Sequence, residues 1–148
     1  ILVVDDEASL RAITRQTLEA YGYVVLTAAN GGDALAIYSR HKDGIDVVLT
    51  DMMMPVMDGV ALTLAVRKTN PAERVLATSG LSDKEHQSKA LGAGARLFLP
   101  KPYNAEMLLN SLAEILHDAE MPSVNLPPAF PSAPHDSAVT KCLVLAGE

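Results

Sequence analysis

The sequence is poor in cysteine, in aromatic residues and in positive charge. Its 148 residues include a single cysteine, Cys142, and no tryptophan, and aromatic residues make up 4% of the chain. Because a lone cysteine cannot form an internal disulfide, the sequence fits a reducing compartment, and we expect a cytoplasmic protein. The 12 Lys and Arg residues are outnumbered by 18 Asp and Glu residues, so the net charge is -6. Direct binding to nucleic acid is not expected, since phosphate contacts need clustered cations.

Long apolar runs are also missing. No segment approaches the roughly 20 apolar residues that span a bilayer, so we expect no membrane contact from this chain. The apolar start, residues 1–4, lacks the basic residues and the length of a signal peptide. The chain opens at Ile1 rather than Met, already inside an apolar run, and we interpret it as an excerpt from a longer protein.

What the sequence does contain is a series of short apolar runs separated by helical patterns. The interiors of these runs are continuously apolar, as in residues 47–49, which is typical of strands buried on both faces of a parallel sheet. The expected strands are residues 1–4, 23–28, 45–50, 74–79 and 95–99. Strand and helix alternate, and right-handed crossovers then predict an α/β fold: a doubly wound parallel sheet with helices on both sides.

The helical patterns have recognisable ends. The first has an apolar stripe that includes Leu10, Ile13 and Leu18, and Gly22 follows it as a stop signal. The last can be capped by Asn104, and its expected apolar face is Met107, Leu108, Ser111, Leu112, Ile115 and Leu116.

Beyond the last helical pattern the composition changes. Five of the nine prolines fall between Pro122 and Pro134, mixed with Ser and Ala. We therefore predict one folded domain over residues 1–118 and a flexible tail over residues 119–148.

Acidic residues stand at the ends of two expected strands. Asp5 and Asp6 follow the first strand, and Asp51 closes the third, whose other residues are mostly apolar. The adjacent acids Asp5, Asp6 and Glu7 can simply favour a helix N-terminus. In a doubly wound sheet, however, the first and third strands are neighbours, so the carboxylates of Asp5, Asp6 and Asp51 should converge. Two unit charges 4 Å apart repel by about 4 kcal/mol at an effective dielectric near 20, and a hard divalent cation, Mg²⁺ or Mn²⁺, would remove that repulsion.

An amine and a hydroxyl follow the remaining strands. Lys101 lies between Pro100 and Pro102, which fix the backbone, so its ammonium is directed rather than loosely solvated. Ser79 and Thr78 end the fourth strand, and because side chains alternate along a strand only one of them should face the site. We select Ser79, which is nearer the loop.

Four segments in this order resemble the receiver domain of two-component response regulators. They are ILVVDDE at 1–7, DMMMPVMDG at 51–59, TSG at 78–80 and LFLPKP at 97–102, and the resemblance covers roughly residues 1–117. It implies a flavodoxin-like fold with five parallel strands in the order 2-1-3-4-5 and five helices, and a cis peptide bond between Lys101 and Pro102.

The resemblance also implies a role for each residue. Asp51 matches the aspartate that accepts a phosphoryl group from a phosphohistidine on a histidine kinase or histidine phosphotransfer domain. Asp6, Asp51 and the backbone carbonyl of Met53 match Mg²⁺ ligands, and Asp5 assists through water. Ser79 and Lys101 match the groups that bind the phosphoryl group, and Phe98 matches an aromatic switch residue. Met53 and Leu81 match positions that flank the path of hydrolytic water, so they are expected to set the lifetime of the phosphorylated state.

Two other functions share part of this residue set. A degenerate receiver would act only as a docking module, although all of the matched chemical positions are intact here. A phosphohydrolase of the haloacid dehalogenase type also uses Asp, Ser or Thr, Lys and Mg²⁺, but its acids follow the first strand as D-x-D, where this chain reads Asp5-Asp6-Glu7. The domain itself is expected to catalyse only its own phosphorylation and dephosphorylation. The pattern through ATSG and LFLPKPYNAEMLL favours the C-terminal receiver of a hybrid histidine kinase, and the oligomeric state is left open.

Overall fold

A computed structural model describes residues 1–80 and 84–117 of the chain. Its five strands are parallel and form one sheet in the order β2-β1-β3-β4-β5. The strands are β1 (Leu2–Val4), β2 (Leu26–Ala28), β3 (Val48–Asp51), β4 (Val75–Ser79) and β5 (Leu97–Pro100). The strand order and the alternation with five helices confirm the predicted doubly wound α/β fold.

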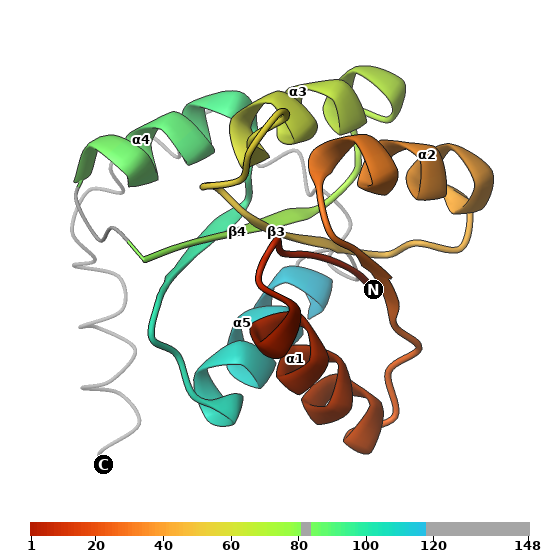
Figure 1. The fold of residues 1–148 in the computed structure, drawn as a ribbon, viewed down its shortest axis with the longest axis vertical. Coiled ribbons are helices and arrows are strands. Elements are labelled where there is room, and N and C mark those ends of the chain that lie inside the picture. Colours follow the sequence, from red (N-terminus) through yellow and green to blue (C-terminus); the bar gives the residue numbers. More distant parts are fainter. Residues whose placement is uncertain (81–83, 118–148) are drawn as a thin grey trace, which may run out of the picture.

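The helices cover both faces of this sheet. Figure 1 shows them in two layers, one on each face of the sheet. On the first face are α1 (Ala8–Ala20) and α5 (Ala105–His117), and on the second are α2 (Gly31–His41), α3 (Gly59–Thr69) and α4 (Lys84–Ala93). The order of the strands reverses at β1 and β3, so the loops that follow these two strands open at the same edge of the sheet.

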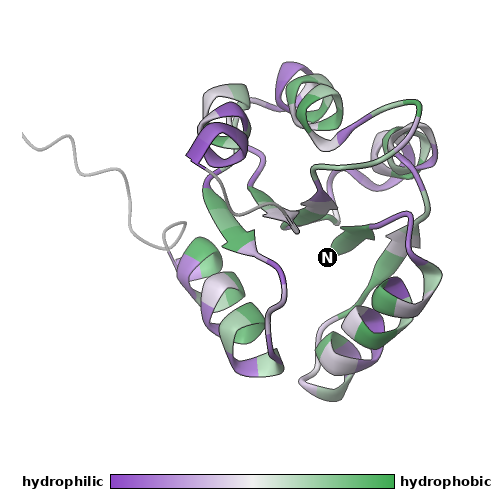
Figure 2. Cartoon of the chain, turned by 60° about the vertical axis from the view of Figure 1, so that its left-hand side comes forward, coloured by the Kyte–Doolittle hydropathy of each residue, from purple (hydrophilic) through white to green (hydrophobic). Residues whose placement is uncertain are grey.

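The strands supply side chains to two separate hydrophobic cores. Leu2 and Val4 belong to the core that includes α2 and α3 residues, whereas Val3 between them belongs to the core that includes α1 and α5 residues. Burial on both faces explains why the strand sequences are continuously apolar. Figure 2 shows the same contrast, because the strands are predominantly apolar and the helices carry both apolar and polar residues.

The observed strands are shorter than the sequence predicted. The largest difference is at the second strand, which was expected over residues 23–28 and is observed as Leu26–Ala28. This edge strand pairs only with β1, in the register Leu2 to Leu26, so its ladder cannot extend past its partner. The third strand is shifted toward its carboxyl end and includes Asp51, which is paired in register with Thr78.

The helix ends agree with the predicted signals, but some apolar stripes do not. Gly22, with φ +89°, follows α1, and the Asn104 side chain accepts a hydrogen bond from the Met107 N–H at 2.8 Å. Leu18 of the first stripe is buried, as expected, but Ile13 was expected to be buried and is 59% exposed, and the other buried residue of α1 is Thr14. Met107 is likewise 40% exposed.

Two further expectations concern the C-terminal part of the chain. The Lys101–Pro102 peptide bond is cis, as the family resemblance implied. The predicted tail, residues 119–148, lies outside the described residues, so the domain division remains a prediction. Among the helices of the described residues, none has the length and apolar composition of a membrane span.

Candidate functional site

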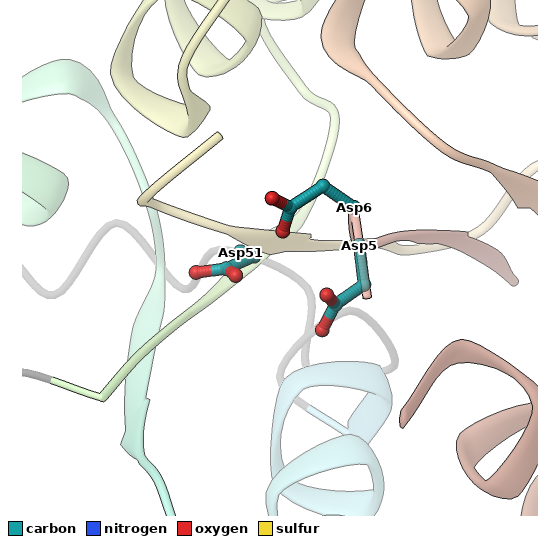
Figure 3. Close-up of side chains that lie close together, drawn as sticks. All are labelled: Asp5, Asp6 and Asp51. Atoms are coloured by element: carbon teal, nitrogen blue, oxygen red, sulfur yellow. The ribbon is translucent and has the colours of Figure 1, made fainter. Parts of the chain in front are cut away.

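Three aspartates meet at the carboxyl ends of β1 and β3. These strands are hydrogen-bonded neighbours, with Val4 in register with Thr50, so the residues that follow them emerge side by side. Asp5, Asp6 and Asp51 each offer a carboxylate oxygen, and these oxygens lie within 4.8 Å of one another. Figure 3 shows the three side chains gathered around one space. The predicted convergence of the acids is therefore observed.

Lys101 places an ammonium group among these acids. Its Nζ donates to Asp5 Oδ2 at 3.0 Å and to Asp51 Oδ2 at 3.1 Å. The side chains of Lys101, Asp5 and Asp51 are 16%, 8% and 9% exposed, so these pairs are partly shielded from water. Hydrogen-bonded ion pairs of this kind also fix the direction of each side chain.

Backbone groups hold the other oxygen of each buried carboxylate. The N–H of Met53 donates to Asp51 Oδ1 at 3.0 Å, and the N–H of Glu7 donates to Asp5 Oδ1 at 2.9 Å. Arg11 donates from its guanidinium to the backbone carbonyl of Asp5 at 2.6 Å. Neither Arg11 nor the Glu7 N–H was identified from the sequence, because both contacts depend on how the chain turns from β1 into α1.

Burial and charge act in opposite directions on the two central groups. Burial raises the pKa of the Asp51 carboxyl, an effect that the Met53 N–H and Lys101 oppose without cancelling. Burial by itself would lower the pKa of Lys101, but the hydrogen bond to Asp5 and the charges of Asp51 and Asp5 outweigh it, so the net shift is upward. Lys101 is therefore an ammonium ion across the physiological range, and a positive charge is fixed beside Asp51.

The strand β4, which ends at Ser79, lies between β3, which ends at Asp51, and β5, which Lys101 follows. Ser79 pairs in register with Pro100, and its carbonyl accepts a hydrogen bond from the Lys101 N–H at 2.8 Å. The Ser79 side chain is buried at this end of the strand. Thr78, the alternative residue, donates its hydroxyl to the carbonyl of Thr50 at 3.4 Å, so its hydroxyl is turned to the neighbouring strand β3.

The remaining predicted residues lie around this centre. Phe98 in β5 is partly buried against the core on the α2–α4 side of the sheet. The side chain of Met53 is 51% exposed beside the acids, whereas Leu81 lies outside the described residues. A role of Met53 and Leu81 in the lifetime of a phosphorylated state therefore remains a prediction.

The loop after Asp51 is held close to β3 by a glycine. A Cβ at Gly59 would meet the carbonyl oxygen of Asp51 and the Cα of Met52, so only glycine lets α3 begin this near to the strand. Within the loop, Val56 has φ +69° and is fully exposed. A β-branched residue is rarely found in this conformation, and such strain tends to gather at functional sites.

The donor set fits a hard divalent cation. Asp5, Asp6 and Asp51 bring three negative charges to one place, and Lys101 brings one positive charge, so two negative charges stay uncompensated. Carboxylate oxygens are the ligands that Mg²⁺ prefers, with water and phosphate oxygens completing its shell. The exposed carboxylate of Asp6 leaves the site open to solvent on one side.

Comparison with known proteins gives one family. The family described as response regulator receiver domain matches residues 1–113. The chain is 34% identical to a probable transcriptional regulator, ycf27, of Porphyridium aerugineum, over 84% of this chain and 51% of that protein. It is 35% identical to the sensor kinase CckA of Brucella abortus, over 78% of this chain and 12% of that protein. The chain thus spans about half or less of the length of these relatives.

A solved structure shares the fold as well as the sequence pattern. The crystal structure of a CheX–CheY–BeF3–Mg²⁺ complex from Borrelia burgdorferi has a TM-score of 0.74 and 29% identity to this chain. The match covers 77% of this chain and 86% of that one.

Proposed function

The chain belongs to the response regulator receiver domain family, the signalling domains of two-component systems, and we propose that it accepts a phosphoryl group on the carboxylate of Asp51. The observation that carries this assignment is the contact of Lys101 with Asp51 within a cluster of three acids. Asp5 and Asp51 are each held between a backbone N–H and this ammonium. Of the two, Asp51 lies in the strand that pairs with β4, in register with Thr78 and next to Ser79.

The chemistry we propose is a direct displacement at phosphorus. An oxygen of Asp51 attacks the phosphorus of a phosphohistidine, the phosphorus–nitrogen bond breaks, and its electron pair leaves with the imidazole, which takes up a proton. The protein acts mainly by positioning and by charge, as in other phosphoryl transfers. Lys101 balances the negative charge of the incoming phosphoryl oxygens, and the Ser79 hydroxyl hydrogen-bonds one of them. The same residues then hold the aspartyl phosphate.

A divalent cation completes the proposed site. Mg²⁺, or Mn²⁺ in its place, would be held by Asp6 and Asp51 with the carbonyl of Met53, while Asp5 acts through water. When bound, the ion would neutralise the carboxylates and draw electron density from the phosphoryl oxygens. The two uncompensated negative charges of the cluster support this part of the proposal.

Phosphorylation is proposed to change the surface around β5. Movement of Ser79 toward the phosphoryl group would open space beside Phe98, which is only partly buried. The aromatic ring would then pack inward and alter the face formed by α4 and β5. This is a switch between two packings, biased by the phosphoryl contacts.

The proposed donor is a histidine kinase or a histidine phosphotransfer domain, and the proposed compartment is the cytoplasm. Receiver domains as a family interact with such proteins. The similarity to a sensor kinase supports our further proposal that the parent protein is a hybrid histidine kinase, although several relatives of comparable identity are transcriptional regulators. Reading the gene beyond Ile1 and Glu148 distinguishes these parents.

The assignment of Asp51 is tested by intact-mass spectrometry with acetyl phosphate and Mg²⁺. We expect the protein to gain the mass of one phosphoryl group and the Asp51→Asn variant to gain none, because the amide is not a nucleophile of comparable strength. Asp43→Asn is the matched control, since Asp43 is exposed at the opposite end of the sheet. An unchanged mass gain in Asp51→Asn would refute the assignment.

A further inference from the structure

A cavity of about 320 Å³ adjoins the proposed phosphoacceptor site. Two of its lining residues belong to that site: Lys101, which contacts Asp51, and Gly80, which directly follows Ser79. Its other wall is formed by Leu10 and Ile13 of α1 and by the start of the β5–α5 connection, Pro102 and Tyr103. A group that enters this cavity therefore lies beside Lys101.

The cavity wall away from Lys101 is largely hydrocarbon. Leu10, Ile13 and Pro102 contribute only apolar side-chain atoms, and the hydroxyls of Thr14 and Tyr103 lie 3.4 Å apart and bond to each other. Ile13 is 59% exposed in this wall, and a polar residue at such a surface position of α1 would not disturb the core. An apolar wall next to the partly buried ammonium of Lys101 is the composition expected for a ligand with an apolar body and an anionic end.

The size of the cavity limits what that body is. An apolar cavity of about 150 Å³ is large enough to hold benzene in a protein, so a space of this size accommodates one aromatic ring with room for its substituents. The methyl group of acetyl phosphate would leave most of the space unfilled. A phosphodonor with an aromatic group would cover the exposed part of Ile13 and the faces of Pro102 and Tyr103.

We propose that this cavity is a subsite for the leaving group of small-molecule phosphodonors, and that it selects acyl phosphates with an aromatic acyl group. The inference rests on the proposed function, since it concerns the donor used by Asp51. With benzoyl phosphate, an oxygen of Asp51 attacks phosphorus and the bond from phosphorus to the benzoyl oxygen breaks. Benzoate leaves with the electron pair, so no proton donor is required. The ring occupies the cavity while the phosphoryl group lies beside Lys101.

The test compares initial rates of phosphorylation by benzoyl phosphate and by acetyl phosphate, at constant Mg²⁺, using intact-mass spectrometry. For each protein, the rate with benzoyl phosphate is divided by the rate with acetyl phosphate. Comparison of this rate ratio between a variant and the wild type cancels the intrinsic reactivities of the two donors. We expect the rate ratio to be about fivefold lower in Ile13→Ser than in the wild type, which corresponds to about 1 kcal/mol of lost transition-state binding. Ile13→Trp, which fills the cavity, should lower it as well. Val24→Ser is the matched control, because Val24 is 81% exposed and does not line this cavity.

The outcomes separate this inference from the proposed function. Equal ratios in the wild type, Ile13→Ser and Ile13→Trp would overturn the subsite and leave Asp51 as the phosphoacceptor. Absence of phosphorylation by both donors in the wild type would overturn the proposed function and the subsite with it. A ratio that falls in both Ile13 variants and is unchanged in Val24→Ser would support the subsite.

Discussion

Lys101 neutralises one of the three charges that Asp5, Asp6 and Asp51 bring together, and this incomplete balance has a measurable consequence. A divalent cation that binds the folded state stabilises it by mass action, by ~1.4 kcal/mol at a concentration tenfold above its dissociation constant. We therefore expect the melting temperature to rise by several degrees with millimolar Mg²⁺, and to rise less in Asp6→Ala. Differential scanning calorimetry at constant ionic strength measures both.

The metal-free proteins provide the control for this experiment. Without Mg²⁺, Asp6→Ala should be as stable as the wild type or more stable, because one repelling charge is gone. Asp43→Ala removes an exposed acid at the other end of the sheet and should keep the full response to Mg²⁺. A wild-type protein whose melting temperature does not respond to Mg²⁺ would show that the three carboxylates do not bind the ion.

The convergence of the functional side chains was predictable because the carboxyl ends of parallel strands meet at one edge of a sheet. That rule predicts Asp5, Asp51 and Lys101 at one edge of the sheet. It gave no information on Arg11, whose contact with the Asp5 carbonyl depends on the turn into α1, or on the exposure of Ile13. Such details follow from the local path of the backbone, which the apolar pattern does not encode.

At the scale of the elements, a buried pair far from the site joins α2 to the connection between α3 and β4. The hydroxyl of Tyr38 donates to Glu73 Oε2 at 2.7 Å, and both side chains are almost fully buried. Glu73 also accepts hydrogen bonds from the side chain of Asn70 and from the N–H of Arg74, at 3.4 and 3.2 Å. The pair therefore fixes the position of α2 relative to the start of a central strand.

This pair makes stability depend on pH in the alkaline range. Burial, together with the hydrogen bond and charge of Glu73, raises the pKa of Tyr38 from 10.0 to about 12. Since the folded pKa lies above the unfolded one, the stabilisation is fully present below pH 10 and is lost as the pH rises toward 12. Ultraviolet titration of the folded protein should show one tyrosine ionising later than the others, and Tyr38→Phe should remove that late phase.

Tyr38→Phe should also destabilise the fold by about 1–3 kcal/mol, because the buried carboxylate of Glu73 loses a donor. Urea unfolding near neutral pH measures this loss. Tyr21→Phe, at a residue that is 66% exposed, is the control and should change neither the stability nor the late titration. If Tyr38→Phe unfolds at the same urea concentration as the wild type, the pair does not hold α2 in place.

The existence and order of the elements followed from the sequence, but their bounds did not. Strands that are buried on both faces have continuously apolar sequences, whereas helices that are buried on one face have apolar residues at helical spacing. The alternation of these two patterns therefore predicts each strand and helix. Strand ends depend instead on the length of the neighbouring strand, as at β2, which stops where β1 stops. The Tyr38–Glu73 pair could not be predicted from the sequence either, because the two residues are far apart in the chain and belong to no recognisable motif.

At the scale of the whole molecule, the two ends of the sheet have different roles. The carboxyl ends of β1, β3, β4 and β5 carry the acids, the hydroxyl and the amine, while the amino end of β4 carries the Tyr38–Glu73 pair that supports the fold. Helices lie on both faces of the sheet (Figure 1), and the acids and Lys101 lie at its carboxyl end.

We propose above all that Asp51, and neither Asp5 nor Asp6, carries the phosphoryl group. Borohydride reduces an aspartyl phosphate to homoserine, so treatment of the phosphorylated protein followed by peptide mass spectrometry identifies the modified residue directly. We expect homoserine at position 51, with Asp5 and Asp6 unchanged. Homoserine at either of those two positions, or a phosphorylated protein with no homoserine at all, would contradict it.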